Sequence, residues 1–280
     1  MKNPHSTTTL NCGGKSLSLD VPRIMGILNV TPDSFSDGGQ FVRLDAAMQH
    51  AENLINAGAD ILDIGGESTR PGAADVPEQQ ELDRVMPVLE AVSSRFDCIV
   101  SIDTSKATVM QAVSQSGAGI INDVRALQEP DALKIVAKAG LPVCLMHMQG
   151  APRSMQSSPS YQNVVVEVLE FLQERVGQCV ASGIARDQII IDPGFGFGKT
   201  LEHNIALIEG LPDLTNVAPV LIGLSRKRMI GQMLGDDETD RATGSVVAAL
   251  RCIEQGASIV RVHDVAQMAQ AIRIHAAITA

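Results

Sequence analysis

IIIDPGFGFGKT, residues 189–200, is the stretch that decides the fold. Three isoleucines lead directly into Asp192, and glycines follow at positions 194, 196 and 198. A short apolar run bounded by turn residues is typical of a buried strand. The glycines let the backbone turn sharply and let a flat ligand approach closely. The stretch therefore predicts a strand that carries a carboxylate to the mouth of the fold.

Two nucleotide-binding motifs resemble this stretch, and neither fits. A P-loop needs a glycine five residues before its Gly-Lys pair, and that position is Pro193. The dinucleotide pattern G-x-G-x-x-G fails because its third glycine is replaced by Lys199. A purely structural strand-to-helix turn explains the glycines, but it leaves an aspartate in an apolar strand unexplained.

Composition indicates one domain with an aliphatic core. The chain has 280 residues, a length that α/β barrels often reach as a single domain, and it contains 45% hydrophobic residues but no Trp. The net charge of −10 argues against binding to nucleic acid or to a membrane. An anionic ligand must therefore meet a local group of basic side chains.

The chain ends and the cysteines carry little functional signal. Residues 1–22 lack an apolar signal core and are expected to form a tail with a short hairpin around Gly13 and Gly14. No apolar run is long enough to span a bilayer. The five cysteines have no zinc-binding spacing, so we expect reduced, buried thiols in a cytoplasmic protein.

Residues 23–280 alternate between apolar runs and helical patterns. We predict strands at 24–30, 61–65, 99–103, 120–124, 143–147, 189–192, 220–225 and 259–263. We predict helices at 44–57, 78–96, 106–116, 131–139, 163–182, 201–210, 239–255 and 265–278. Continuous apolar strands favour a parallel sheet buried on both faces. The pattern predicts a (β/α)8 TIM barrel, with an open doubly wound sheet as the alternative.

Several of these helices are followed by glycine, which favours a left-handed C-terminal cap. The glycines stand at positions 58, 117, 140, 183 and 256.

Polar side chains gather at the predicted carboxyl ends of the strands, where barrel enzymes place their active sites. Asp103, Asn122 and Asp192 follow middle strands. Lys227, Arg261 and His263 follow the last two, where such barrels commonly bind phosphate. This separation of charge predicts a flat, nitrogen-rich heterocycle that bears a phosphate-type group.

Single residues have simpler explanations. Asp103 and Asp123 could cap helices, Asp63 could be a buried paired group, and His147 could be a core histidine. One of the three basic residues at 226–228 is expected to be a solvated charge. The first two loops after strands are long and glycine-bounded, and we expect Phe35 and Arg70 in them to contact a substrate.

Nine motifs make the chain resemble the dihydropteroate synthase family over nearly its whole length. They are GILNVTPDSFSDGG (26–39), DIGGESTRPGA (63–73), SIDTSK (101–106), INDV (121–124), MHMQGAPRSMQ (146–156), DPGFGFGKT (192–200), GLSRKRMIG (223–231), RATG (241–244) and RVHDV (261–265). The resemblance implies a barrel enzyme of folate synthesis that joins 4-aminobenzoate to (7,8-dihydropterin-6-yl)methyl diphosphate and releases pyrophosphate.

The resemblance also implies roles for individual residues. The pterin site would contain Asp103, Asn122, Val124, Met146, Asp192, Phe197, Gly223, Lys227 and Arg261. The diphosphate site would contain Asn29, Thr69, Arg261 and His263, with Mg2+ near Asn29 as the cofactor. The aminobenzoate site would contain Phe35, Thr69, Arg70, Pro71, Ser225 and Lys227. The catalytic set would be Asn29, Asp103, Lys227, Arg261 and His263.

The implied reaction is an SN1-like substitution. Departure of pyrophosphate leaves a methylene cation, which a carboxylate such as Asp103 can stabilise, and a neutral aryl amine needs no strong general base. Loop closure through Phe35, Asp37 and Arg70 would build the second site.

Two other functions remain open. One is a pterin-dependent methyltransferase, and the other is a barrel that binds without catalysis. A homodimer is expected through the late helices, at the small residues Gly244, Ser245, Ala248 and Ala249.

Overall fold

The computed structural model describes residues 8–31, 40–68, 72–73, 75–150, 155–236 and 239–279. Strands and helices alternate as predicted after an N-terminal hairpin. The strands of the barrel are β3 (Arg23–Asn29), β4 (Ile61–Gly65), β5 (Ile99–Asp103), β6 (Ile120–Asp123), β7 (Val143–Met146), β8 (Ile189–Asp192), β9 (Leu221–Ile222) and β10 (Ile259–Val262). The helices are α1 (Gln40–Asn56), α2 (Glu78–Arg95), α3 (Ala107–Ser114), α4 (Ala132–Ala139), α5 (Val164–Ala181), α6 (Leu201–Glu209), α7 (Leu211–Thr215), α8 (Arg228–Leu234), α9 (Ala242–Glu254) and α10 (Val265–Thr279).

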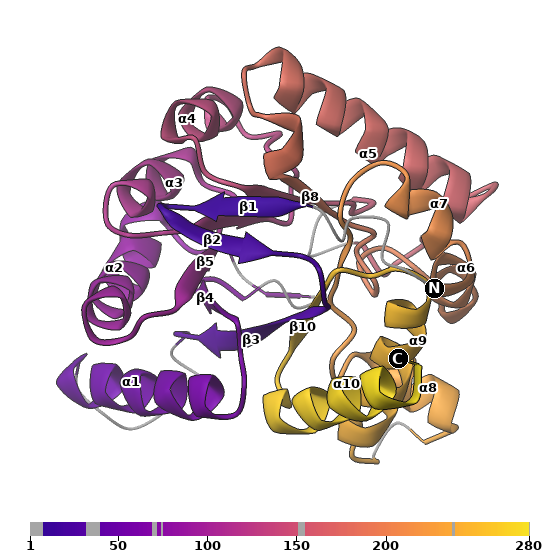
Figure 1. Ribbon diagram of the computed structural model, residues 1–280. Helices are drawn as coiled ribbons and strands as arrows, with labels where there is room; N and C mark the ends of the chain where they lie inside the picture. Colours follow the sequence, from indigo (N-terminus) through magenta and orange to yellow (C-terminus); the bar gives the residue numbers. More distant parts are fainter. Residues whose placement is uncertain are drawn as a thin grey trace.

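Eight of the ten strands in the described residues form one parallel sheet in the order β8-β7-β6-β5-β4-β3-β10-β9. A bridge between Ile191 and Val220 joins β8 to the residue before β9. The backbone N–H of Ile191 donates to the carbonyl of Pro219 at 3.0 Å across the same seam. The sheet therefore closes on itself inside a ring of helices, which excludes the open doubly wound sheet and confirms the TIM barrel (Figure 1).

Side chains alternate between the inside of the barrel and the layer beneath the helices, as the two-residue period of a strand requires. Outward positions such as Leu28, Ile64 and Val260 join the large aliphatic cluster that packs against the helices. Inward positions near the start of each strand form a second, separate apolar cluster. It contains Met25, Ile61, Ile99, Ile120, Cys144, Ile190, Leu221 and Ile259, one residue from each strand.

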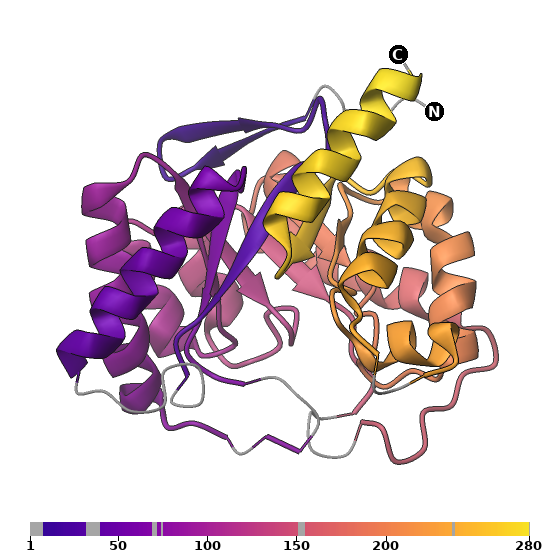
Figure 2. The same cartoon turned by 90° about the horizontal axis from the view of Figure 1, so that it is seen from below.

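The antiparallel hairpin of β1 (Thr9–Cys12) and β2 (Lys15–Ser18) covers this end of the barrel. Its side chains Leu10, Cys12 and Leu17, with Leu19, pack into the same cluster as the first inward residue of every strand. Figure 2 shows the hairpin at one end of the barrel and the loops that follow the strands at the other. The hairpin predicted around Gly13 and Gly14 is thus confirmed, and it covers the end of the barrel opposite to the carboxyl ends of the strands.

The structure differs from the predicted elements mainly after β8. Helices α7 and α8 were not predicted, because they are only five and seven residues long and contain Pro212 and Gly231. Strand β9 has two residues rather than six, since the chain leaves the sheet after Ile222. The glycines predicted to end helices, at 58, 117, 140, 183 and 256, all have positive φ angles. No helix in the described ranges is long and apolar enough to cross a membrane.

Candidate active site

The inward positions near the carboxyl ends of the strands are polar, in contrast to the apolar layer beneath them. Two residues beyond Ile61, Ile120, Ile190 and Ile259 along their strands stand Asp63, Asn122, Asp192 and Arg261. Asp103 stands two further residues along β5, after Ser101. The two-residue period therefore brings these side chains to one interior layer without any further device. All four of the acidic and amide groups are at most 8% exposed.

Arg261 lies between two of these carboxylates. Its Nε donates to Asp63 Oδ2 at 2.6 Å, and its Nη2 donates to Asp103 Oδ2 at 2.9 Å. The Nδ2 of Asn122 donates to Asp63 Oδ2 at 3.3 Å. Asp63 is fully buried, so its interpretation as a paired group inside the barrel is confirmed. The acidic and basic walls expected from the sequence are therefore not separate, because the long arginine side chain reaches across the barrel.

Burial is the largest single influence on the pKa values of the side chains in this layer. It raises the pKa of Asp103 to about 7, although Arg261 opposes the change. It also raises the pKa of Asp192, against the influence of Lys227. Burial alone would lower the pKa of Arg261, but Asp63 and Asp103 together raise it above its ordinary value. The layer thus holds a permanent cation together with two carboxylates, Asp103 and Asp192, that bind protons more readily than usual.

Lys227 reaches this layer from the end of the segment after β9. Its Nζ donates to the carbonyl of Phe195 at 2.5 Å and lies 4.4 Å from the centroid of the Phe197 ring. Burial lowers the pKa of Lys227 to about 8, and Asp192 opposes the change. A cation over an aromatic face is held electrostatically. This contact fixes the ammonium group beside Asp192.

Ser225 and His263 form a second polar pair at the barrel mouth. The Oγ of Ser225 lies 3.0 Å from His263 Nδ1 and accepts from the backbone N–H of His263 at 3.1 Å. The neighbouring Arg226 is half-exposed and donates to Asp264 at 2.5 Å. Arg228 is exposed as well, so two of the three basic residues at 226–228, rather than the single one expected, lie toward solvent, and Arg226 is paired with Asp264.

The other predicted residues of the mouth are placed as follows. Asn29 ends β3, and a Cβ at Gly65 would lie 3.5 Å from its Oδ1 and 3.6 Å from the Cβ of Asp103. The side chains of Asn29 and Asp103 therefore both lie beside Gly65. Val124 and Met146 are buried, and a Cβ at Gly223 would lie 3.9 Å from Asp192 Oδ2. Phe35, Asp37, Thr69, Arg70 and Pro71 lie outside the described residues.

Asp123 has the opposite orientation and does not join this layer. Its carboxylate accepts from the backbone N–H groups of Arg125 and Leu127 and from the hydroxyl of Ser105 at 2.5 Å. The side chain therefore organises the turn after β6. The buried Arg175 supports the same turn, because it donates to the carbonyls of Ala126 and Leu127.

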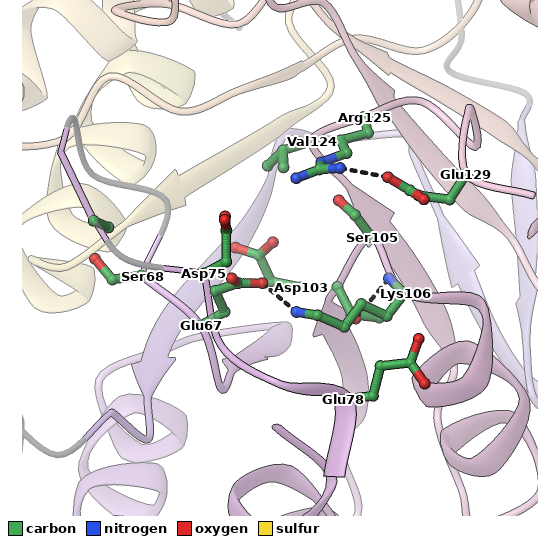
Figure 3. A pocket seen from close by; sticks show the side chains of 12 residues that line it. Glu67, Ser68, Asp75, Glu78, Asp103, Ser105, Lys106, Val124, Arg125 and Glu129 are labelled. Atoms are coloured by element: carbon green, nitrogen blue, oxygen red, sulfur yellow. Dashed lines mark hydrogen bonds and ion pairs between the residues drawn. The ribbon is translucent and has the colours of Figure 1, made fainter. Parts of the chain in front are cut away.

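A cleft of about 210 Å3 borders Asp103 on the side of β4, β5 and β6. Lys106 spans this region, with its Nζ 2.5 Å from Glu67 Oε2 (Figure 3). The same Nζ lies 2.5 Å from the Oε2 of the buried Glu81. The other Glu67 oxygen accepts from the backbone N–H of Val76 at 2.9 Å. Glu67 therefore joins the two ends of the segment between β4 and α2.

The glycines after Asp192 form the sharp turn that was predicted, and two of them also have a role that was not predicted. A Cβ at Gly194 would lie 1.9 Å from the carbonyl oxygen of His147, and one at Gly198 would lie 2.5 Å from that of Gln149. These glycines therefore let the loop after β8 approach the backbone of the loop after β7. Their φ angles of 70° and 61° are also ones that side chains disfavour.

One buried cation behind this loop was not predicted from the sequence. Lys199 is only 4% exposed, and its Nζ lies 3.0 Å from His147 Nδ1. His147 is itself 6% exposed, so the interpretation of a core histidine is confirmed. The burial of His147 and, secondly, the charge of Lys199 lower the pKa of His147 to about 3. The only signal in the sequence was a lysine placed between glycine-rich residues and a helix cap.

Comparison with known proteins identifies the class of barrel. Residues 25–263 match the family of pterin binding enzymes. A dihydropteroate synthase of Haemophilus influenzae is 53% identical over 266 residues, which cover 95% of this chain and 97% of that protein. The chain therefore belongs to the dihydropteroate synthase family.

Solved structures agree with this assignment. The Xanthomonas albilineans dihydropteroate synthase with 4-aminobenzoic acid superposes with a TM-score of 0.92 at 48% identity, over 98% of both chains. The enzyme from the same organism in complex with 7,8-dihydropteroate has a TM-score of 0.88 at 45% identity, over 97% of this chain and 99% of the other.

The contact between the two loops predicts a large effect of Gly194→Ala. The new Cβ meets the carbonyl of His147, so the substitution combines backbone strain with a steric clash. Gly140→Ala is the matched control, because Gly140 has a similar φ of 66° and no atom lies within 4 Å of the place that its Cβ would occupy. We expect G194A to lower the free energy of unfolding by about 1–3 kcal/mol more than G140A, measured by urea denaturation. Equal losses would contradict the close approach of the loops.

Proposed function

We propose that this chain condenses 4-aminobenzoate with (7,8-dihydropterin-6-yl)methyl diphosphate to 7,8-dihydropteroate and releases pyrophosphate. The observation that carries the proposal is the buried interior layer of Asp103, Asn122 and Asp192 around Arg261, in a chain of this family. Relatives solved with 4-aminobenzoic acid and with 7,8-dihydropteroate support the choice of substrates.

The acidic layer suits the pterin ring. A pterin presents several N–H groups along one edge, and Asp103, Asp192 and the amide of Asn122 supply buried acceptors for them. The edge of the Arg261 guanidinium is occupied by Asp63 and Asp103, which leaves its flat face for stacking on the ring. Val124, Met146, Phe197 and Gly223 would form the walls of the slot.

The diphosphate would lie toward Asn29, His263 and Arg261, at the mouth of the barrel, with Thr69 beyond the described residues. The described residues hold no group of three or more His, Cys, Asp or Glu side chains that could bind a metal. A single protein ligand such as Asn29, together with the diphosphate, would suit Mg2+, which is usually held by one or two protein ligands together with substrate phosphates and water. Asn29 would hold the ion, which when bound would neutralise charge on the leaving pyrophosphate.

The second substrate would bind beside Lys227 and Ser225. Ser225 is 6% exposed and is fixed by its contact with His263. Lys227 is held over Phe197, where its ammonium group can meet the carboxylate or ring of 4-aminobenzoate. Phe35, Thr69, Arg70 and Pro71 are proposed to complete this site, and they lie outside the described residues.

The chemistry requires stabilisation of positive charge rather than a strong base. When pyrophosphate leaves, a methylene cation conjugated with the pterin remains, and the aryl amine attacks it. Asp103 lies in the layer where that charge develops, so its carboxylate would stabilise the cation. The neutral amine loses its proton only after the new C–N bond has formed.

The other two functions are not favoured. Methyl transfer from a pterin has no support from the relatives described above, which are all named dihydropteroate synthase. A barrel without catalysis would have no need to retain Asn29, Lys227 and His263 together, and all three are present.

Asp192→Asn tests the proposal directly. The substitution keeps the shape of the side chain but removes a buried carboxylate from the pterin site, so we expect at least a roughly hundredfold fall in pterin affinity. Calorimetry would measure binding, and pyrophosphate release would be assayed with Mg2+ and both substrates, each omitted in turn. Asp187→Asn, on the exposed turn before β8, is the control. Pyrophosphate release that is independent of aminobenzoate would contradict the proposal.

Binding of the pterin should also depend on pH. Because the pKa of Asp103 is raised to about 7, its carboxyl in the free site takes up a proton as the pH falls through that value. A protonated carboxyl accepts poorly, so affinity should fall by up to about tenfold per pH unit below the pKa. The raised pKa of Asp192 acts in the same direction. Asp103→Asn should show low affinity at every pH; a wild-type affinity that is flat between about pH 6 and about pH 8 would exclude this linkage.

We also propose a homodimer formed through α8, α9 and α10. Exposed apolar side chains on these helices include Met233, Val247 and Ile274. The small residues expected to form this interface instead face inward in part, since Ser245 and Ala249 are buried and a Cβ at Gly244 would meet Ile230 at 2.7 Å.

Val247→Asp tests the dimer, because a charge at an apolar interface weakens association. Val247 is 62% exposed within one chain, so the substitution should leave its fold intact. Sedimentation velocity should show a shift toward monomer for V247D and no shift for Val166→Asp on α5. An unchanged sedimentation coefficient for V247D would rule out this interface.

The cytoplasm is the compartment that we propose for the chain. All five cysteines are free thiols, which a reducing compartment maintains. Fractionation of expressing cells would test this assignment.

A further inference from the structure

Lys199 is a buried cation for which the roles above give no function. It follows the glycine-rich loop after β8 and directly precedes Thr200, the N-cap of α6. Lysine is rarely buried to this degree without a carboxylate beside it. Burial lowers the pKa of Lys199 to about 7, although Asp192 opposes the change. Keeping an ammonium group at this position is therefore costly, which suggests that the group has a function.

The Nζ of Lys199 contacts three acceptors, which equals the number of N–H bonds of an ammonium group. They are His147 Nδ1 at 3.0 Å, the carbonyl of Phe197 at 3.0 Å and the carbonyl of His147 at 3.5 Å. His147 follows β7 and Phe197 follows β8. One buried group therefore joins two loops whose residues are 52 positions apart in the chain.

The same loop positions a residue of the proposed site. The Phe197 ring lies beneath the ammonium group of Lys227, and the carbonyl of Phe195 accepts from it. Other contacts hold the loop from outside, including Tyr161, whose hydroxyl donates to the carbonyl of Gly198 at 2.9 Å. Lys199 differs from them because it bonds to the peptide of Phe197 itself and lies within the electrostatic reach of Asp192.

We propose that Lys199 is a positioning residue for the pterin slot, which acts by fixing Phe197 and, through that ring, Lys227. The inference rests on the proposed function, because it assumes that Phe197 and Lys227 border the pterin. Lys199 does not need to touch the substrate. Its ammonium group holds the loop after β8 against His147, so that the aromatic face stays beneath Lys227.

The test compares Lys199→Met with the wild type by calorimetry, using (7,8-dihydropterin-6-yl)methyl diphosphate as the probe. Methionine keeps the length of the side chain but offers no N–H to the three acceptors. Since small misplacements in a site are costly, we expect pterin affinity to fall roughly tenfold to a hundredfold. Lys134→Met, at an exposed position of α4, is the matched control and should bind as the wild type does.

A double-mutant cycle separates positioning from general stability. If Lys199 acts through Phe197, the effect of K199M on pterin affinity should shrink to less than about threefold in a Phe197→Leu background. Independent, multiplicative effects of K199M and F197L would overturn the proposal. Lys199→Gln, which retains an N–H donor, should fall between the wild type and K199M in affinity.

The remaining outcomes are also decisive. A wild-type protein that does not bind the pterin would refute the proposed function rather than this inference. A wild-type protein that binds, together with K199M that binds equally well, would refute this inference alone. If K199M and K199Q both fail to fold by circular dichroism, Lys199 serves stability only, and the positioning role is rejected.

Discussion

The guanidinium of Arg261, placed between Asp63 and Asp103 inside the barrel, is the interaction on which the site depends. Removing one member of a buried ion pair commonly costs about 3–5 kcal/mol, because the remaining charge is left without compensation. Arg261 comes from β10, while its partners come from β4 and β5. The barrel must therefore close between its first and last strands before these charges are satisfied. The site therefore forms only when the barrel closes, and closure of the barrel brings Arg261 to its two carboxylates.

The period of the strands explains why the site is so compact. Each strand carries an inward apolar residue near its start, and the site side chains of β4, β5, β6, β8 and β10 follow it two or four residues later. Side chains of the opposite orientation, such as Asp123 and His147, lie outside this layer. Asp123 accepts from the backbone of the turn after β6, and His147 contacts Lys199 and the Phe171 ring of α5. The chemistry of a strand end is thus decided by whether its position is odd or even relative to the first inward residue.

The sequence predicted the alternation of strands and helices because continuous apolar runs and terminal glycines are local signals. It also predicted which strand ends carry Asp103, Asn122 and Asp192. It could not predict that Arg261 reaches across to the acidic side, since side-chain length and barrel width decide that contact. Nor could it predict the burial of Lys199, whose partner His147 is distant in the chain. Helix α8 was missed because a seven-residue element gives too short a periodicity.

The hairpin across the amino ends of the strands closes that end of the barrel, so the proposed site opens at the carboxyl ends. With Leu10 and Leu17 sealed against the floor, no ligand can pass through the barrel axis. Both substrates and both products would therefore enter and leave through the mouth at the carboxyl ends of the strands. Pyrophosphate, which lies nearer the rim than the heterocycle in the proposed arrangement, can depart while the pterin remains inside. In that arrangement, depth within the barrel favours release of pyrophosphate before release of the product that contains the pterin.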